Sequence, residues 1–325
     1  MECTACKKPA TLVCGDCNGS SILEGDPPIA YYCNSVCQET HWTHHEPTCR
    51  RLQDRKALYM VGEMAQRLFY IHRDITWKSL DIGKVEKVGN NLIIRERTTD
   101  DATTTSPKKY RIFPSHLVST KEDKDAILVF KACVEGVRWT MEFVDGMLEG
   151  IVRTSTHFVY KAKNDSLRTR CYPLSTSFLE IINNMDYISH EIIKVTLRSG
   201  EVFAVDITGA QYGYHEPVTP WTKYEQERIF CAISAVDPYP SSKLLQIDDY
   251  NLQELNYFYK LAEGPKPHIF MTALAIMKWH ILGWQKHENM SLKKWWALPE
   301  ETLRMKLNDL IHFIEWSFRS PIEIL

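Results

Sequence analysis

The sequence predicts a small cysteine-rich module followed by a larger α+β domain whose C-terminal third is helical. Eight cysteine and histidine residues lie within residues 3–49 in four close pairs, which is typical of a metal-stabilised module. Alternating apolar and polar residues at 84–97 and across much of 152–207 predict antiparallel strands. From residue 224 onward the apolar spacing is mainly helical.

Length and composition suit this division. With 325 residues, of which 44% are hydrophobic and 25% charged, the chain can form a small module and a domain with its own core. The net charge of -2 and the excess of acidic side chains in residues 1–50 provide no basic face for nucleic acid. The long apolar run 269–284 contains Lys278 and His280 and is too short to span a bilayer comfortably. We therefore expect neither direct nucleic-acid binding nor a membrane segment.

The cysteine-rich module offers ligands for two zinc ions. Seven cysteines and one histidine form four pairs whose members are separated by two or three residues. Two ligands at this spacing bind one tetrahedral ion through a tight turn or one helical turn, and zinc accepts all-thiolate sets as well as sets with one imidazole. The pairs are Cys3 with Cys6, Cys14 with Cys17, Cys33 with Cys37, and His45 with Cys49.

The order and spacing of these pairs resemble the MYND zinc finger. Residues 32–49 carry the run Y-C-x3-C-Q-x3-W-x2-H-x3-C without a gap, and the resemblance covers residues 3–49, called the finger below. It implies interleaved pairing, in which the first pair joins the third and the second joins the fourth. On that basis one zinc takes Cys3, Cys6, Cys33 and Cys37, and the other takes Cys14, Cys17, His45 and Cys49.

One ligand of the second set has a local competitor. Cys37, His41 and His45 follow one another at intervals of four residues, so all three share one face of a helix. His41 is therefore an alternative ligand on spacing alone. The W-x2-H spacing from Trp42 in the resemblance selects His45, and we then expect His41 to cap or pack nearby.

The resemblance also implies a partner. MYND fingers bind short proline-containing peptides of other proteins, and Gln38 and Trp42 match the positions that contact them. Trp42 can offer an apolar wall to a proline ring, and Gln38 can both donate and accept hydrogen bonds with peptide backbone. Packing inside the finger is the alternative role for Trp42. The expected function is a zinc-binding interaction adaptor, with transcription regulation suggested by analogy.

Beyond the finger (domain 1–49), we expect a connecting helix at 50–77 and the α+β domain at 78–325. Helical and alternating patterns, punctuated by glycine-containing turns, locate the elements of that domain. The expected strands are 84–87, 91–97, 152–161, 188–197 and 202–207. The expected helices are 122–151, 224–233, 251–262, 267–285 and 299–318.

A histidine and an aspartate on one predicted hairpin form a second constellation. His190 and Asp206 are sixteen residues apart on two strands joined by a turn at Ser199 and Gly200, so the carboxylate can orient the imidazole. Residues 133–211 thereby resemble the transglutaminase-like or papain-like core, in which a nucleophilic cysteine lies earlier, at the start of a helix. The resemblance implies Cys133 as nucleophile in a cysteine hydrolase or acyltransferase.

The predicted helix 122–151 argues against that activity. It places Cys133 in the helix interior among apolar residues, where a thiol gains little from a helix N-terminus and is usually inert. Cys171 is the second candidate nucleophile. Together with Cys231, these cysteines are an odd and scattered set, which indicates a reducing compartment, nucleus or cytoplasm. On the sequence, the adaptor is therefore favoured over the enzyme.

Overall fold

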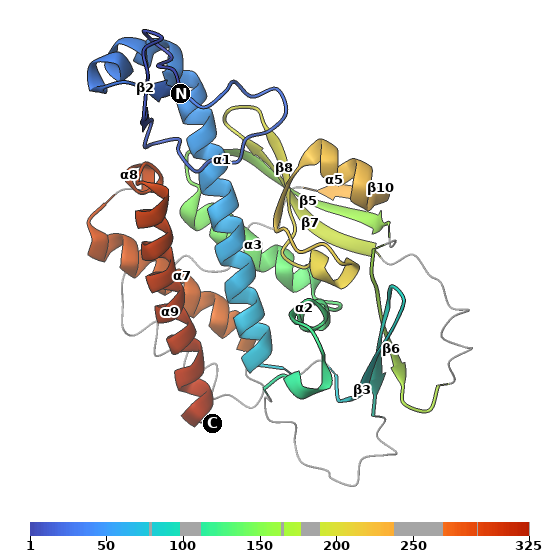
Figure 1. Ribbon diagram of the computed structural model, residues 1–325. Helices are drawn as coiled ribbons and strands as arrows, with labels where there is room; N and C mark the ends of the chain where they lie inside the picture. Colours follow the sequence, from blue (N-terminus) through green and yellow to red (C-terminus); the bar gives the residue numbers. More distant parts are fainter. Residues whose placement is uncertain are drawn as a thin grey trace.

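The computed structural model describes residues 1–77, 80–97, 112–163, 166–176, 189–236, 269–290 and 292–324 (Figure 1). A small N-terminal module is followed by a mixed α/β domain with a helical C-terminal region, as the sequence predicts. The expected helix at 251–262 lies outside the described residues. Within the described ranges, no helix is long and apolar enough to cross a membrane.

One helix, α1 (Ser35–Ile75), runs from the module into the domain. It begins at Asn34, whose side-chain oxygen accepts a hydrogen bond from the Cys37 backbone N–H at 2.9 Å. Its 41 residues give it a length of about 60 Å. The expected connecting helix is thus the second part of a longer element, because the helix that begins among the zinc ligands has no break at Cys49.

The larger sheet has five antiparallel strands in the order β10-β5-β7-β8-β9. A tight turn joins β7 to β8, and there Gly200 has a φ of +90°, which favours glycine. The hairpin register pairs Ile193 with Val205. The strands are β5 (Val152–Ala162), β7 (Ser189–Leu197), β8 (Val202–Val205), β9 (Val218–Pro220) and β10 (Ile229–Val236).

A smaller sheet contains β3 (Ile82–Val88), β4 (Asn91–Glu96) and β6 (Arg168–Pro173). The first two strands form the expected antiparallel hairpin, but β4 and β6 are parallel. The expectation of antiparallel strands throughout was therefore wrong at this pair. Parallel pairing is possible because the long intervening chain, including β5, provides the crossover.

Helices cover one face of the larger sheet. The helix α3 (Cys133–Met147) packs on β7, and α1 packs beside α3 (Figure 1). The C-terminal helices α7 (Ile269–Glu288), α8 (Leu292–Trp296) and α9 (Glu300–Ile324) complete this side. One core cluster joins these helices to the inward side chains of β7 and β8.

The predicted helix 122–151 is two helices, α2 (Lys121–Leu128) and α3. Lys131, between them, has a positive φ of 56°, which a continuous helix does not allow. The break has a packing cause. Leu128 and Phe130 are buried with the smaller sheet, whereas Val129 and Ala132 are buried in the main core. The chain turns because adjacent apolar residues serve two cores.

The predicted helix 224–233 is also divided. Residues up to Arg228 form α5 (Trp221–Arg228), and the chain then enters β10. Pairing with the edge of β5 supplies the backbone partners of β10, so tertiary pairing overrides the helical spacing. The short helix lies over the far face of the sheet, where Tyr224 is buried with Tyr160.

Candidate functional site

The first group of metal ligands lies where the N-terminal loop meets the start of α1. Cys3 and Cys6 come from the loop before the short strand β1 (Leu12–Val13), Cys33 follows β2 (Tyr31–Tyr32), and Cys37 lies in the first turn of α1. All four sulfur atoms lie within 4.8 Å of one another. The Sγ atom of Cys33 lies 3.6 Å from that of Cys6 and 3.4 Å from that of Cys37.

The second group is fully buried. Cys14 and Cys17 belong to the loop after β1, and His45 and Cys49 lie one helical turn apart on α1. The sulfur atoms of Cys14 and Cys49 are 3.7 Å apart, and His45 Nε2 lies 3.6 Å from Cys17 Sγ. These four ligand atoms also lie within 4.8 Å of one another.

Both groups fit tetrahedral zinc. A Zn–S bond of about 2.3 Å places two sulfur ligands ~3.8 Å apart at the tetrahedral angle, close to the distances within both groups. Four protein ligands leave no position for water, so each ion would have a structural role. The cofactor prediction of two zinc ions with interleaved pairing is confirmed by these groups. His41 lies outside both, and its Nδ1 faces the Tyr32 hydroxyl at 3.1 Å.

Two buried cations on α1, just after the finger, bind the loops of the finger. Arg55 is 1% exposed and forms ion pairs with Asp26 of the finger and with Glu201 of the β7–β8 turn. Lys56 is 2% exposed, and its ammonium group donates to the main-chain oxygen of Asp16 at 2.9 Å. Because buried cations need such partners, the fold of the finger is coupled to that of the helix.

The two predicted peptide-contact residues differ in their surroundings. Trp42 is half-buried, packs edge-on against His45 with ring centroids 6.1 Å apart, and lines a cavity of about 420 Å³. Gln38 lies four residues earlier on α1, is partly exposed, and is absent from the residues that line this cavity. Packing inside the finger and a surface facing a cavity thus coexist at Trp42. Peptide contact by either residue stays a prediction.

A second constellation lies at one end of the larger sheet. Cys133 is the first residue of α3, His190 is the second residue of β7, and Asp206 directly follows β8. His190 Nε2 lies 3.0 Å from Asp206 Oδ1, and both side chains are almost completely buried. The expectation that Cys133 lies inside a helix was wrong, because the break before α3 places it at the N-terminus.

The second ring nitrogen of His190 is left for the thiol. Its Nδ1 is buried and has no well-aligned hydrogen-bond partner in the described part of the chain. Burial alone would lower the pKa of His190, but the charge and hydrogen bond of Asp206 and the nearby Cys133 thiol raise it to about 9. At neutral pH the imidazole is therefore held in its protonated form between Asp206 and Cys133.

Two tyrosines hold the carboxylate of Asp206. The Tyr224 hydroxyl donates to Asp206 Oδ2 at 2.7 Å and lies 2.6 Å from the Tyr160 hydroxyl. Burial opposes ionisation of Asp206, but the charges of His190 and Arg228 hold its pKa below the ordinary value. Sequence reasoning missed both tyrosines. The sequence pattern places Tyr224 at the start of the predicted helix 224–233, and nothing local in the sequence connects it with residue 206.

A glutamine also links the loops around this constellation. Gln211 accepts a hydrogen bond from the Lys131 backbone N–H at 3.4 Å and donates to the Thr208 carbonyl at 3.1 Å. The loop that precedes Cys133 is thereby tied to the loop that follows Asp206. Sequence reasoning missed Gln211 as well, because its partners lie in different segments.

The other two cysteines lie elsewhere. Cys171 is on β6 in the smaller sheet, where burial and the neighbouring Glu96 raise its pKa to about 11. Cys231 is exposed on β10. Neither joins His190, so of the candidate nucleophiles only Cys133 is brought to the histidine among the described residues.

Comparisons with known proteins identify the N-terminal part. The family model described as MYND finger matches residues 3–49, the segment that contains both groups of ligands. Neither a curated protein nor a solved structure matches the chain. The family match and the two ligand groups agree in extent and in residues, and residues 3–49 are a MYND zinc finger.

Proposed function

We propose that the protein is an interaction adaptor whose finger binds proline-containing segments of partner proteins. The carrying observation is the position of Trp42, which packs on the zinc ligand His45 and also lines a cavity. A rigid indole with one side fixed can form a wall for a proline ring at little cost in side-chain entropy. Gln38, one helical turn away, supports the proposal with an amide group for peptide backbone.

The zinc ions act in this function by folding the finger. Its buried cluster is small and consists largely of the ligand residues themselves, so metal binding provides much of its folding free energy. By analogy with other proteins that carry MYND fingers, we extend the proposal to transcription regulation, in the nucleus or the cytoplasm.

Binding of a displayed library of short peptides, each with one fixed proline, tests the adaptor function. We expect the zinc-loaded full chain to enrich such peptides and the Trp42→Ala variant to lose them. Trp316→Ala is the matched control, because this tryptophan is 65% exposed on α9, away from the finger. Equal enrichment by Trp42→Ala and the unmodified chain would contradict the proposal.

A specific observation favours a second function, that of a cysteine hydrolase or acyltransferase. Cys133 opens α3 beside a buried imidazole whose other nitrogen is held by Asp206. A helix N-terminus and a neighbouring imidazolium both favour thiolate, the nucleophilic form of cysteine. The adaptor and the enzyme are compatible, since they use different parts of the chain.

The reaction of such a site can be written for these three residues. In the protonated form described above, His190 Nδ1 already carries the proton given up by the sulfur of Cys133, and this sulfur attacks a carbonyl carbon of the substrate. The C–N or C–O bond to the leaving group then breaks as His190 returns the proton to that group, which leaves an acyl thioester on Cys133. Attack by water or by an amine on the thioester carbonyl then breaks the C–S bond to Cys133, and His190 takes the proton of the attacking group; water gives hydrolysis and an amine gives acyl transfer.

Alkylation of native, zinc-loaded protein by iodoacetamide, read residue by residue by mass spectrometry, tests the second function. We expect Cys133 to react faster than Cys171, whose raised pKa keeps it a thiol. The His190→Gln variant should slow Cys133 while leaving Cys171 unchanged, with circular dichroism as the check on folding. Slow reaction of Cys133 in folded, unmodified protein would remove the basis for the enzyme.

A further inference from the structure

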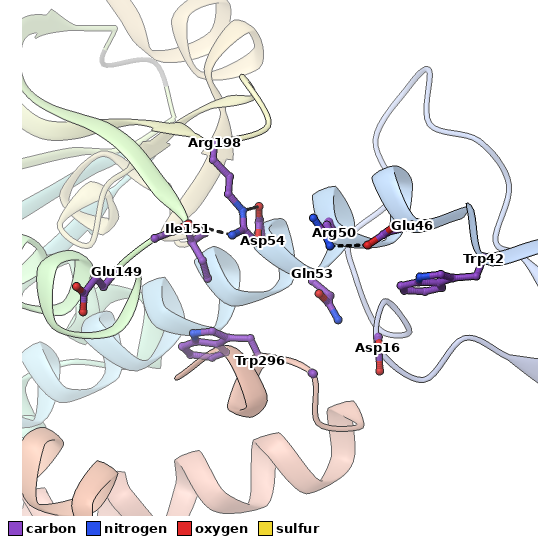
Figure 2. A pocket seen from close by; sticks show the side chains of 12 residues that line it. Asp16, Trp42, Glu46, Arg50, Gln53, Asp54, Glu149, Ile151, Arg198 and Trp296 are labelled. Atoms are coloured by element: carbon purple, nitrogen blue, oxygen red, sulfur yellow. Dashed lines mark hydrogen bonds and ion pairs between the residues drawn. The ribbon is translucent and has the colours of Figure 1, made fainter. Parts of the chain in front are cut away.

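The cavity of about 420 Å³ lined by Trp42 is a cleft between the finger and the α+β domain, and the proposed function uses only its Trp42 end. Figure 2 shows its two ends, with Trp42 of the finger on one side and Glu149 of the α3–β5 turn on the other. Gln53 of α1 lies between them, and Trp296 of α8 forms part of the opposite wall. The cleft is called the finger–domain cleft below.

Its walls are fixed by contacts outside the cleft. The indole N–H of Trp296 donates to the Met147 carbonyl at 3.1 Å, and this side chain is 2% exposed. Trp42 is held against the zinc ligand His45. Trp42 is therefore a fixed aromatic surface of the cleft, and the buried Trp296 holds the opposite wall in place from behind, so a ligand that enters loses little free energy to ordering of the walls.

The charges of the finger–domain cleft do not balance. Four carboxylates and two guanidinium groups line it. The guanidinium groups are committed, because Arg50 pairs with Glu46 and Arg198 pairs with Asp54. The remaining two carboxylates, Asp16 and Glu149, have no ion-pair partner in the described ranges.

Neither carboxylate forms an ion pair with a lysine in the described ranges, but the charge of Lys56 acts on Asp16. The ammonium group of Lys56 binds the main-chain oxygen of Asp16, not its side chain. Glu149 is exposed on its turn. The cleft therefore attracts a cationic group above all at its Glu149 end, and an elongated ligand that also contacts Trp42 crosses the space beside Gln53.

We propose that the finger–domain cleft is the continuation of the peptide site and selects proline-containing segments that also carry lysine or arginine. The proposal rests on the proposed function of the finger and adds a substrate class to it. The proline contacts Trp42, the amide of Gln53 bonds to peptide backbone, and the basic side chain pairs with Glu149. An extended peptide suits this arrangement because its side chains can reach separate positions along the cleft.

Enrichment from the proline-fixed peptide library tests the proposal on the full, zinc-loaded chain. We expect the selected peptides to contain lysine or arginine at one preferred spacing from the proline, and Glu149→Gln to abolish that preference. A synthetic peptide from the selection should bind about two- to fivefold more weakly to Glu149→Gln, the effect of one exposed charge pair. Added salt should reduce this difference. Glu122→Gln is the matched control, because Glu122 is exposed on α2 outside the cleft.

The outcomes separate the two proposals. Enrichment of proline without a basic neighbour overturns the selection by the cleft and leaves the finger function intact. A basic preference that survives in Glu149→Gln also overturns it, because the cation then binds elsewhere. Loss of all Trp42-dependent enrichment overturns both. If free lysine, free arginine or a proline-free basic peptide binds as tightly as the selected peptide, the cleft is a cation site without peptide selection, and the proposal is likewise overturned.

Discussion

Arg198 donates hydrogen bonds to both carboxylate oxygens of Asp54, from Nε to Oδ2 at 2.7 Å and from Nη2 to Oδ1 at 2.6 Å. This two-pronged ion pair joins the β7–β8 turn to α1. Asp54 is 2% exposed, and burial raises its pKa although Arg198 opposes the shift. The sheet therefore supports a charge that the helix could not hold alone.

Replacing the arginine of this pair should destabilise the protein. Arg198→Leu leaves Asp54 buried without its partner, and we expect a loss of about 1–3 kcal/mol in the free energy of unfolding. Urea denaturation followed by circular dichroism measures it. Arg319→Leu is the control, because Arg319 pairs with Glu315 on the surface of α9 and such pairs contribute at most about 1 kcal/mol. Equal effects of the two substitutions would show that the pair at Asp54 is not special.

The metal content distinguishes the two neighbouring histidines. We expect two zinc ions per chain in the unmodified protein and in His41→Ala, because His41 lies outside both ligand groups. His45→Ala removes one ligand of the buried group and should lower the zinc content. Elemental analysis after dialysis against a weak chelator gives the answer. Loss of zinc from His41→Ala with retention in His45→Ala would reverse the ligand assignment.

Removal of zinc should weaken the domain as well as the finger. Arg55 and Lys56 are buried with partners in the finger, and chelation that unfolds the finger deprives both cations of those partners. We expect a strong chelator to lower the melting temperature of the main transition. Scanning calorimetry with and without chelator measures the change, and re-addition of zinc is the control. If the melting temperature of the main transition is the same with and without chelator, the finger and the domain are energetically independent.

The stability of the protein should depend on His190 at alkaline pH. Its pKa rises from an ordinary 6.5 to about 9 in the folded chain, so folding favours the protonated ring. The resulting stability is fully present below pH 6.5 and is lost as the pH rises through about 9. Comparing the unfolding free energies of the unmodified chain and His190→Gln along this range should show a shrinking difference. A difference that does not change with pH would refute the raised pKa.

The finger and the hairpin were predictable because their information is local. Ligands two or three residues apart can bind one ion through a single turn, and the turn at Gly200 brings His190 and Asp206 together within one hairpin. The position of Cys133 was not predictable in this way. The apolar residues around Cys133 have helical spacing throughout, which predicts one continuous helix. The helix breaks before Cys133 because these residues are buried in two separate cores.

The finger–domain cleft is still further from local prediction. Trp42 and Trp296 come from opposite ends of the chain, and no periodicity relates them. The same holds for the contact between Tyr224 and Asp206. It depends on the end of α5 at Arg228, where the chain enters β10 and pairs with β5. Such contacts depend on the tertiary arrangement, which overrides the local pattern at these positions.

The continuous helix α1 also sets the distance and the rotation between the finger and the domain wall of the cleft. Each residue of an α-helix turns the chain by about 100° and advances it by about 1.5 Å, so one residue inserted between Cys49 and Arg55 would swing the finger around the helix axis. Trp42 and Glu149 would then no longer face the same space. A substitution in either wall of the cleft changes one contact at a time. An insertion or deletion between Cys49 and Arg55 would instead move the whole finger wall away from the domain wall.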